Sequence, residues 1–281
     1  MNIDYFDQLW EKEKDYKEGY KAGIRDSWDK RAEEFNRNEP DERIHKISKL
    51  LLEKHMLEKE STVLDIGCGP GKFVLAFAQK AKKAVGVDVS PNMLKYASEN
   101  ASALGLENTE FKELDWEKAD VTALGWRKKF SLVTAIMSPV INSRKNLEKM
   151  IEASNEYCLL THFLERQDSI NDVLKKDVLG WDHDDKYGNT ALYCSLNILW
   201  LKGLFPEIFY FDSTRERKWA LERANKHYIN KLEMRNTLTE SQKLNILEYL
   251  GSIAKDGMVE EKITSKIACI YWRNEESTND I

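Results

Sequence analysis

The residues best suited to chemistry in this chain surround a glycine-rich turn, STVLDIGCGPGKFVLAF (Ser61 to Phe77). Its apolar opening predicts a strand that ends near Asp65, and its close predicts a helix with Pro70 at the first position. Three glycines separate the two, Gly67, Gly69 and Gly71. Glycine permits positive φ and lets a ligand approach the backbone without a Cβ in the way. Because a helix N-terminus offers free N–H groups, the stretch predicts a ligand-binding loop.

A second acid, Asp88, ends the next predicted strand, about 20 residues beyond Gly67. A carboxylate at this distance suits two ribose hydroxyl groups and indicates a nucleoside-containing cofactor in a Rossmann-like crevice. A dinucleotide fingerprint would need glycine where the chain has Lys72. Asp65 precedes the first glycine closely, and its carboxylate would repel a pyrophosphate but attract a cationic amine. A cofactor with a ribose, an adenine and an amino-acid end is therefore favoured, and an NAD(P)-linked Rossmann oxidoreductase is the weaker alternative.

Here the chain resembles the class I S-adenosylmethionine (SAM)-dependent methyltransferases, over roughly residues 60–165. VLDIGCGPGKF is similar to the first motif of that family, VGVDVSPNMLKYASENA to the second, TEFKELDWEKADV to the third and KFSLVTAIMSPV to the fourth. Ser131 departs from the fourth motif, in which aspartate usually follows phenylalanine. The resemblance implies SAM as the cofactor and methyl transfer as the reaction. A SAM-binding protein without catalysis is a further alternative.

The resemblance also implies which residues contact the methionine end of the cofactor. The Asp65 side chain would hold this end together with the loop backbone at Gly67, Cys68, Gly69 and Gly71. An interpretation without a ligand is that the acid caps the helix and the glycines serve a tight turn. The joint occurrence of turn, acid and second acid favours the cofactor site.

The nucleoside end would contact residues of the second and third motifs. By resemblance, Asp88 holds the ribose, and Val89 and Met93 pack on the adenine. Asp115 would accept a hydrogen bond from the adenine amino group, and Trp116 would cover the edge of the ring. Met93 and Trp116 have an alternative role as ordinary core residues, because methionine and tryptophan commonly fill the space between a helix and a sheet.

Methyl transfer from a sulfonium is an in-line displacement, for which alignment and the exclusion of water can suffice. The resemblance places Met137, after the fourth predicted strand, at the methyl-transfer site. A base is needed only when the acceptor atom arrives protonated. His162 follows the fifth predicted strand in LLTHF and is the candidate base, with a structural histidine at a strand end as the alternative.

The acceptor is expected to be a small molecule. MSPV, Met137 to Val140, matches poorly the [ND]PP[YF] motif of enzymes that methylate amide or base amino groups. The formal net charge is −5, whereas proteins that neutralise many phosphates usually carry a surplus of lysine and arginine. No nucleic-acid partner and no membrane partner are therefore expected.

The elements that must position these residues alternate between strand and helix, which predicts an α/β fold with a parallel sheet. We expect a Rossmann-like, seven-stranded, mostly parallel sheet with the last strand antiparallel and with helical additions that form a cap. Five strands are predicted at Thr62–Ile66, Ala84–Asp88, Thr109–Glu113, Phe130–Met137 and Tyr157–Thr161, a sixth that runs into a turn in EIFYFDSTRERKW, and the last in ITSKIACIYW. A single methyltransferase domain is expected over residues 1–281, with N-terminal helices or a lid at 1–60, a SAM-binding core at 61–162, helical cap segments at 163–205 and 219–255, and the last strand at 264–272.

Composition sets the remaining expectations. The four cysteines, Cys68, Cys158, Cys194 and Cys269, lie far apart and lack zinc-ligand spacing. Reduced thiols and the lack of a signal-like N-terminus or a long apolar run predict a cytoplasmic, soluble protein. WDHDDKYG (Trp181 to Gly188) concentrates metal-ligating residue types but is interpreted as a solvated loop. No metal site is predicted.

Overall fold

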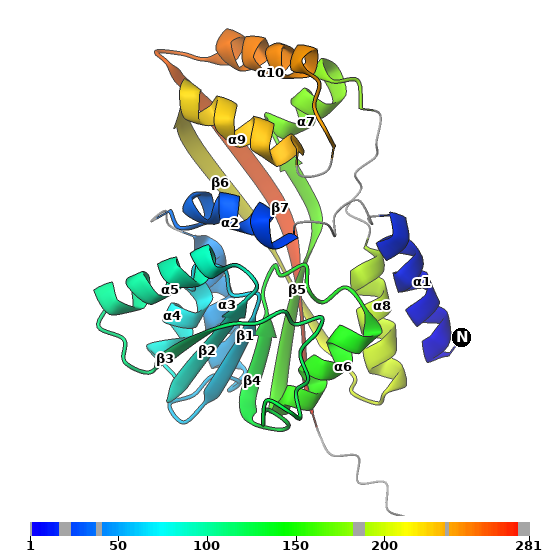
Figure 1. Cartoon of the computed structure of the whole chain (residues 1–281). Helices are drawn as coiled ribbons and strands as arrows, with labels where there is room; N and C mark the ends of the chain where they lie inside the picture. Colours follow the sequence, from blue (N-terminus) through cyan, green and yellow to red (C-terminus); the bar gives the residue numbers. More distant parts are fainter. Residues whose placement is uncertain (1, 17–23, 38–40, 182–188, 234–235, 275–281) are drawn as a thin grey trace, which may run out of the picture.

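A computed structural model describes residues 2–16, 24–37, 41–181, 189–233 and 236–274. In these residues a seven-stranded sheet has the order β3-β2-β1-β4-β5-β7-β6 (Figure 1). The strands are β1 (Thr62–Ile66), β2 (Lys83–Asp88), β3 (Thr109–Glu113), β4 (Phe130–Ala135), β5 (Ser154–Asp168), β6 (Glu207–Ala220) and β7 (Met258–Arg273). All neighbours are parallel up to β5, and β7 runs antiparallel to both β5 and β6. The predicted fold class is confirmed, including the antiparallel last strand.

The strand order reverses direction between β1 and β4. β1 pairs with β2 on one side and with β4 on the other, so the chain leaves β1 toward one edge of the sheet and later returns to its opposite side. In open α/β sheets, ligands bind at such a switch point, in the crevice outside the carboxyl ends of the strands. The glycine-rich turn follows β1 directly and therefore lies at the switch point.

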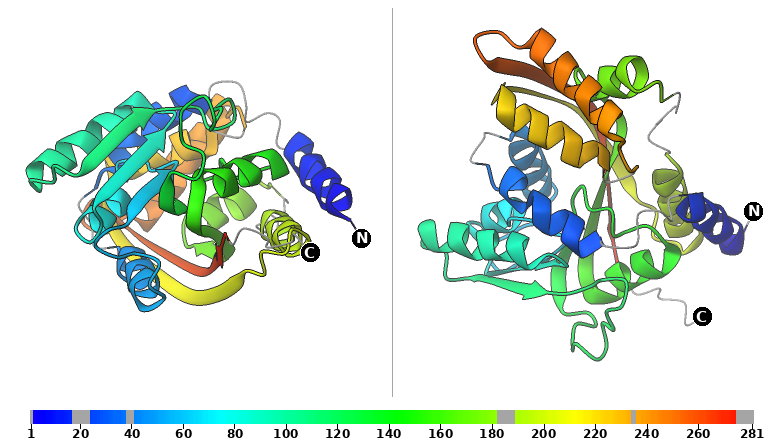
Figure 2. Two further views of the ribbon diagram at one scale, coloured as in Figure 1. Left: turned by 90° about the horizontal axis from the view of Figure 1, so that it is seen from below. Right: turned by 45° about the horizontal axis from the view of Figure 1, so that its top comes forward.

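Helices cover both faces of the parallel part of the sheet (Figure 2). The helices are α1 (Ile3–Tyr16), α2 (Ile24–Phe35), α3 (Glu42–Glu53), α4 (Lys72–Ala78), α5 (Pro91–Ala103), α6 (Arg144–Ala153), α7 (Asn171–Val173), α8 (Thr190–Leu201), α9 (Leu221–Glu233) and α10 (Glu240–Ile253), with a π-helical turn η2 (Leu174–Val178) after α7. One buried cluster joins α3, α4 and α5 to one face, and a second joins α1, α6 and α8 to the other. Val63 belongs to the first cluster and Leu64 to the second, as the two-residue period of a strand requires.

Local signals explain where the helices beside the switch point begin. The Ser90 hydroxyl accepts a hydrogen bond from the Met93 N–H at 3.1 Å, and Pro91 occupies the first position of α5. The Ser143 hydroxyl caps α6 in the same way through the Asn146 N–H. α4 begins later than expected: Gly71, at a φ of 82°, is its N-cap, and Pro70 lies in the preceding turn.

Strands β5, β6 and β7 are longer than the other four and extend beyond the carboxyl edge of the parallel sheet (Figure 1). Helices α7, α9 and α10 pack on this extension around a third buried cluster that contains Trp219, Tyr228, Ile246 and Val259. We call these three helices, η2 and the strand segments 164–168, 213–220 and 258–265 the cap. α2 lies between the cap and α5 (Figure 1).

The extension corrects two predicted elements. Residues 165–168 are part of β5 instead of a helix, because alternate side chains of this polar stretch face the cap and the solvent. Residues 219–250 form no continuous helix: Trp219 and Ala220 end β6, and α9 and α10 follow separately. No helix of the described residues is long and apolar enough to cross a bilayer.

Candidate cofactor and acceptor site

The glycine-rich turn is tied to β2 by its own backbone. The N–H groups of Gly67 and Cys68 donate to the Val87 carbonyl at 2.8 and 3.0 Å. Gly67 has a φ of 73°, and a Cβ on this residue would lie 2.1 Å from the Oγ of Ser138. Glycine is therefore required here both by the backbone conformation and by the close approach of the β4 loop. The turn brings the ends of β1, β2 and β4 together.

Asp65 lies one residue from the end of β1 and is buried. The Thr134 hydroxyl donates to its Oδ1 at 2.7 Å. Burial, together with the nearby Asp88 carboxylate, raises the pKa of the Asp65 carboxyl to about 7, although the hydrogen bond from Thr134 opposes the change. Among the described residues, Thr134 is the one side chain that donates to this carboxylate, so lone pairs remain for an ammonium group.

Asp88 ends β2 beside the turn, so the structure brings the two predicted acids to one edge. Its Oδ2 accepts from the Gly69 N–H at 2.9 Å, and its Oδ1 accepts from the Ser90 N–H at 2.9 Å. Burial raises the pKa of this carboxyl, although the backbone hydrogen bonds oppose the change. Each carboxylate oxygen can accept more than one hydrogen bond, which leaves room for ribose hydroxyl groups.

The apolar residues of the first two motifs line the same turn. A Cβ on Gly69 would meet the Met93 sulfur at 3.9 Å, and the Met93 side chain is buried. Val89 is half-buried next to Asp88. Cys68 is buried, and burial raises the pKa of its thiol well above the usual value. These residues lie where the resemblance expects the cofactor, and their contacts with it stay predictions.

The third motif is divided between surface and core. The Asp115 carboxylate pairs with Lys118 at 2.8 Å and is partly exposed. The Trp116 side chain is buried in the cluster beneath α6, and its indole N–H donates to the Asn146 carbonyl at 3.3 Å. The indole thus already has core neighbours and a hydrogen-bond acceptor. Its expected contact with adenine stays a prediction.

The segment after β4 is joined to the middle of β5 at the expected methyl-transfer site, and His162 lies within β5 instead of after its end, because β5 continues to Asp168. Met137 has a φ of 53°, and its N–H donates to the Thr161 hydroxyl at 2.8 Å. A left-handed non-glycine residue is strained and is often found at a functional site. The neighbouring His162 has a buried Nε2 without a hydrogen-bond partner in the described residues, and burial lowers the pKa of its imidazole to about 4. The imidazole is therefore neutral near pH 7.

α2 connects this edge to the cap, which the sequence motifs do not indicate. Asp29 Oδ1 accepts from the Asn92 N–H at 3.1 Å and from the Ser90 hydroxyl. At the other end of α2, the Glu34 carboxylate lies 3.3 Å from Nδ1 of His227 in α9. α2 therefore contacts both the start of α5 and the cap. Because these contacts join residues that are far apart in the sequence, no local sequence pattern indicates them.

A second group missed from sequence lies on the inner face of the cap. Ser213, Arg215, Arg217 and Trp219 alternate along β6 and share one face of the strand. The alternation in STRERKW is the signal that could have revealed a long strand with arginine on its inner face. The prediction ended the strand in a turn at this point.

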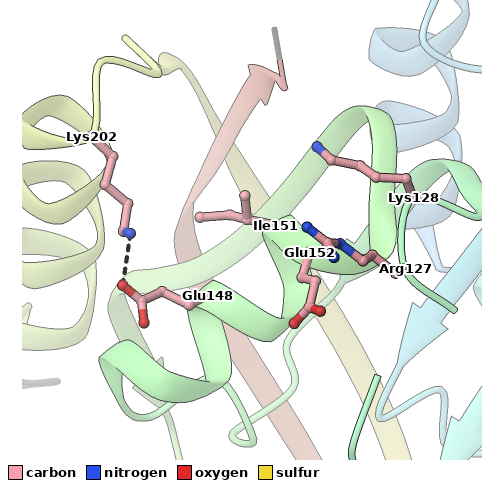
Figure 3. Close-up of a pocket in the computed structure, with 6 residues that line it drawn as sticks. All are labelled: Arg127, Lys128, Glu148, Ile151, Glu152 and Lys202. Carbon is pink, nitrogen blue, oxygen red and sulfur yellow. Dashed lines mark ion pairs between the residues drawn. The ribbon is translucent and has the colours of Figure 1, made fainter. Parts of the chain in front are cut away.

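A surface cavity lies at the opposite, amino edge of the sheet (Figure 3). Its lining residues are Arg127, Lys128, Glu148, Ile151, Glu152 and Lys202, and Lys202 pairs with Glu148 at 2.7 Å. Residues 182–188 of the WDHDDKYG stretch lie outside the described residues. Within the described residues, no three His, Cys, Asp or Glu side chains gather as a metal site.

Comparison with known proteins supports the motifs. The sequence pattern of a family described as "Methyltransferase domain" matches residues 57–180. The 23S rRNA (uracil(1939)-C(5))-methyltransferase RlmD of Alcanivorax borkumensis is 39% identical over 83 residues, which are 30% of this chain and 18% of that enzyme. An uncharacterized RNA methyltransferase of Oceanobacillus iheyensis is 40% identical over 67 residues, 24% of this chain and 15% of the relative. The match thus spans less than a fifth of either relative.

Solved structures give weaker likenesses. The YcgJ protein of Bacillus subtilis is 18% identical, covers 83% of this chain and 100% of its own, and has a TM-score of 0.48. An RNA methyltransferase of Salinibacter ruber with bound S-adenosyl-L-homocysteine (SAH) is 22% identical over 44% of this chain and 77% of its own, with a TM-score of 0.36.

The relatives correct one expectation. The prediction that excluded a nucleic-acid partner in favour of a small molecule is wrong, because the matching relatives are rRNA methyltransferases. The exclusion depended on a net charge of −5, which averages over the whole chain. Binding responds to local charge, and arginines gather on one face of β6 in spite of the average.

Proposed function

We propose that this chain, whose residues 57–180 match a methyltransferase domain family, is a class I SAM-dependent methyltransferase and transfers the methyl group of SAM to an acceptor that enters beneath the cap. The family match supports the enzyme class expected from the motifs, and the motifs themselves favour SAM as the cofactor. We also propose the position of the acceptor, the roles of individual residues and a cytoplasmic location. The four buried, free cysteines support a reducing compartment.

One observation carries the proposal: a buried and a half-buried carboxylate meet at a glycine turn on the switch point of the sheet. Asp65 and Asp88 come from adjacent strands, and both lie against the turn from Gly67 to Gly71. The site fits SAM, because a cationic amino-acid end and a ribose need carboxylate acceptors, whereas a pyrophosphate would be repelled. NAD(P) is disfavoured for the same reason.

Bound SAM supplies an electrophilic methyl group on a sulfonium. The chain's own residues bind SAM, orient it and exclude water from the site. We propose that Asp65 holds the amine, that Asp88 holds the ribose, and that the strained Met137 segment forms the wall at the methyl group. Because these groups are fixed by buried hydrogen bonds, alignment costs little at the moment of reaction. Neutral His162 is available as an acceptor for a proton but is a weak base.

The acceptor class is the finer part of the proposal. The rRNA methyltransferases among the relatives favour RNA. The cap and α2 lie over the carboxyl edge of the sheet, so an acceptor that reaches the cofactor would approach it beside them (Figure 1). We therefore propose that the methylated atom belongs to an unstacked nucleotide of RNA that reaches beneath the cap.

Turnover with radiolabelled SAM tests this function. Purified protein is incubated with [methyl-³H]SAM and either total RNA or the low-molecular-weight fraction of a cell extract, and a ribonuclease arm identifies label in RNA. We expect label in the RNA fraction and none with Asp88→Ala protein at limiting SAM. SAH binding without any labelled product would instead identify a SAM-binding protein without catalysis. NADH binding in place of SAH would identify an oxidoreductase.

A further inference from the structure

The inner face of the cap carries a row of arginines on adjacent strands. In the register, Arg217 of β6 lies opposite Glu261 of β7, and Arg215 lies opposite Ile263. β5 completes the row, since its Arg166 lies opposite Ser265 of β7, one rung from Ile263. Paired residues of neighbouring strands point to the same face of a sheet. The guanidinium groups are thus gathered although their residues are far apart in the sequence.

The carboxylates on this face are already engaged. Glu261 lies 3.8 Å from the Arg217 guanidinium and accepts from the Tyr228 hydroxyl at 2.6 Å. Asp168 pairs with Lys231 at 2.6 Å. Glu261 also stabilises the charge of Arg215 electrostatically, but among the described residues neither carboxylate forms an ion pair or hydrogen bond with Arg215.

Arg215 itself has no ion-pair or hydrogen-bond partner within the described residues, and its Nε is buried. Burial, together with the nearby Arg217 and Arg43, lowers the pKa of its guanidinium to about 10, although Glu261 opposes the change. The group is still protonated at pH 7. A half-buried charge without an ion pair is costly, and proteins normally pair it. The fold holds a cation in place and leaves its hydrogen-bond donors available.

The row borders the cofactor edge through the start of α3. Lys72, the first residue of α4, donates to the Arg37 carbonyl at 2.8 Å, and the Arg37 guanidinium lies 3.7 Å from the centre of the Trp219 ring. Glu42 accepts from the Thr214 N–H at 2.7 Å, one residue before Arg215. A short series of contacts therefore connects the glycine turn with the arginine row. An acceptor beneath the cap would lie between them.

We propose that Arg215 binds an oxyanion, a phosphate or a carboxylate, of the methyl acceptor. The inference rests on the proposed function for the identity of the ligand as acceptor. A planar guanidinium offers parallel N–H donors that match the two oxygens of either group. Arg166 and Arg217 add positive potential, which concentrates anions at the same place.

Anion binding by the full chain tests the inference without a known acceptor. Inorganic phosphate and, separately, acetate are titrated at constant ionic strength into wild-type protein, Arg215→Gln and Arg215→Lys, by calorimetry. We expect roughly 10-fold weaker binding in Arg215→Gln, because a charge-assisted hydrogen bond is lost, and a smaller loss in Arg215→Lys. The preference for phosphate or acetate assigns the anion. Lys218→Gln is the matched control, since Lys218 neighbours Arg217 but points outward to Glu260.

Equal phosphate and acetate affinities in wild-type and Arg215→Gln protein would overturn the inference. If Arg215→Gln does not fold, protection of wild-type Arg215 from phenylglyoxal by phosphate decides the question by mass spectrometry, and unchanged labelling overturns it. SAH affinity is measured alongside and should be the same in all variants. If wild-type protein does not bind SAH, the proposed function is contradicted. If it binds SAH but Arg215→Gln does not weaken phosphate or acetate binding, only this inference is contradicted.

Discussion

The cofactor edge and the arginine row are two polar sites of opposite charge in one molecule. At the edge, the buried Asp65 and the half-buried Asp88 are carboxylates supported by backbone N–H groups and by Thr134. In the row, Arg215 is a half-buried cation without an ion pair in the described residues, and its Nε is buried without a hydrogen-bond partner. The acids suit the cationic end of a sulfonium cofactor, and the arginine suits an anionic acceptor. The difference teaches that each half of the site is complementary to a different ligand.

The two sites also differ in how the chain builds them. The edge is made by short segments: one strand, one turn and the end of the next strand. The row needs β5, β6 and β7 in register, and residues near 166, 215 and 261 meet only when the strands pair. The cofactor edge therefore depends mainly on residues close in sequence, whereas the arginine row depends on the pairing of the cap strands.

Asp88→Ala should produce the largest change in cofactor affinity. The substitution removes the acceptor for the ribose and the partner of the Gly69 and Ser90 N–H groups, so SAH binding should weaken by roughly 2–4 kcal/mol. Calorimetric titration with SAH measures this. Asp120→Ala is the matched control, because Asp120 also accepts from two backbone N–H groups but lies outside the edge. Unchanged SAH affinity in Asp88→Ala would show that the ribose lies elsewhere.

Gly67→Ala should disrupt the edge through its backbone. The new Cβ would collide with Ser138 and hold alanine at positive φ, which should lower the free energy of unfolding by roughly 2–4 kcal/mol. Gly125→Ala provides the comparison, since Gly125 has a φ of 66° and open space around it, and should cost about 1 kcal/mol. Urea unfolding compares the variants. Equal losses would mean that the turn and the β4 loop are not in close contact.

Asp65 should make cofactor binding depend on pH. Its pKa is about 7 in the folded protein, above the usual value of 3.8, so protonation stabilises the fold at low pH and this contribution is lost as pH rises through 7. The amine of SAH needs the ionised carboxylate, so SAH affinity should increase roughly 10-fold from pH 6 to pH 8. Asp65→Asn should abolish the increase. A rise that persists in Asp65→Asn would assign it to another group.

His162 should have the smallest effect. Burial keeps its pKa near 4, and a general base of such low basicity contributes little near pH 7. We expect His162→Gln to reduce kcat less than ~10-fold, below the ~100-fold effect usual for a general base. Single-turnover transfer from labelled SAM measures the chemical step. A larger loss of kcat, with unchanged SAH affinity, would identify His162 as the general base.

Much of the fold follows from periodicity. Short apolar strands between amphipathic helices predicted β1 to β5 in order, with β1 and β3 at their observed bounds. The long ends of β5, β6 and β7 were missed because their alternating polar residues resemble helix and turn sequences. The burial of one face against α9 and α10 decides their conformation, and that contact is remote in the chain.

The sequence by itself determined the glycine turn, the two acids and the order of strands that positions them, because these depend on neighbouring residues and on a period of two or 3.6. Tertiary structure alone decided that Trp116 is covered by core, that Asp29 of α2 reaches the start of α5, and that Arg215 lies beside other arginines with a buried Nε that has no hydrogen-bond partner in the described residues. The physical reason is that a strand pairs with whichever strand is in register, so charges separated by fifty residues become neighbours only after the sheet forms.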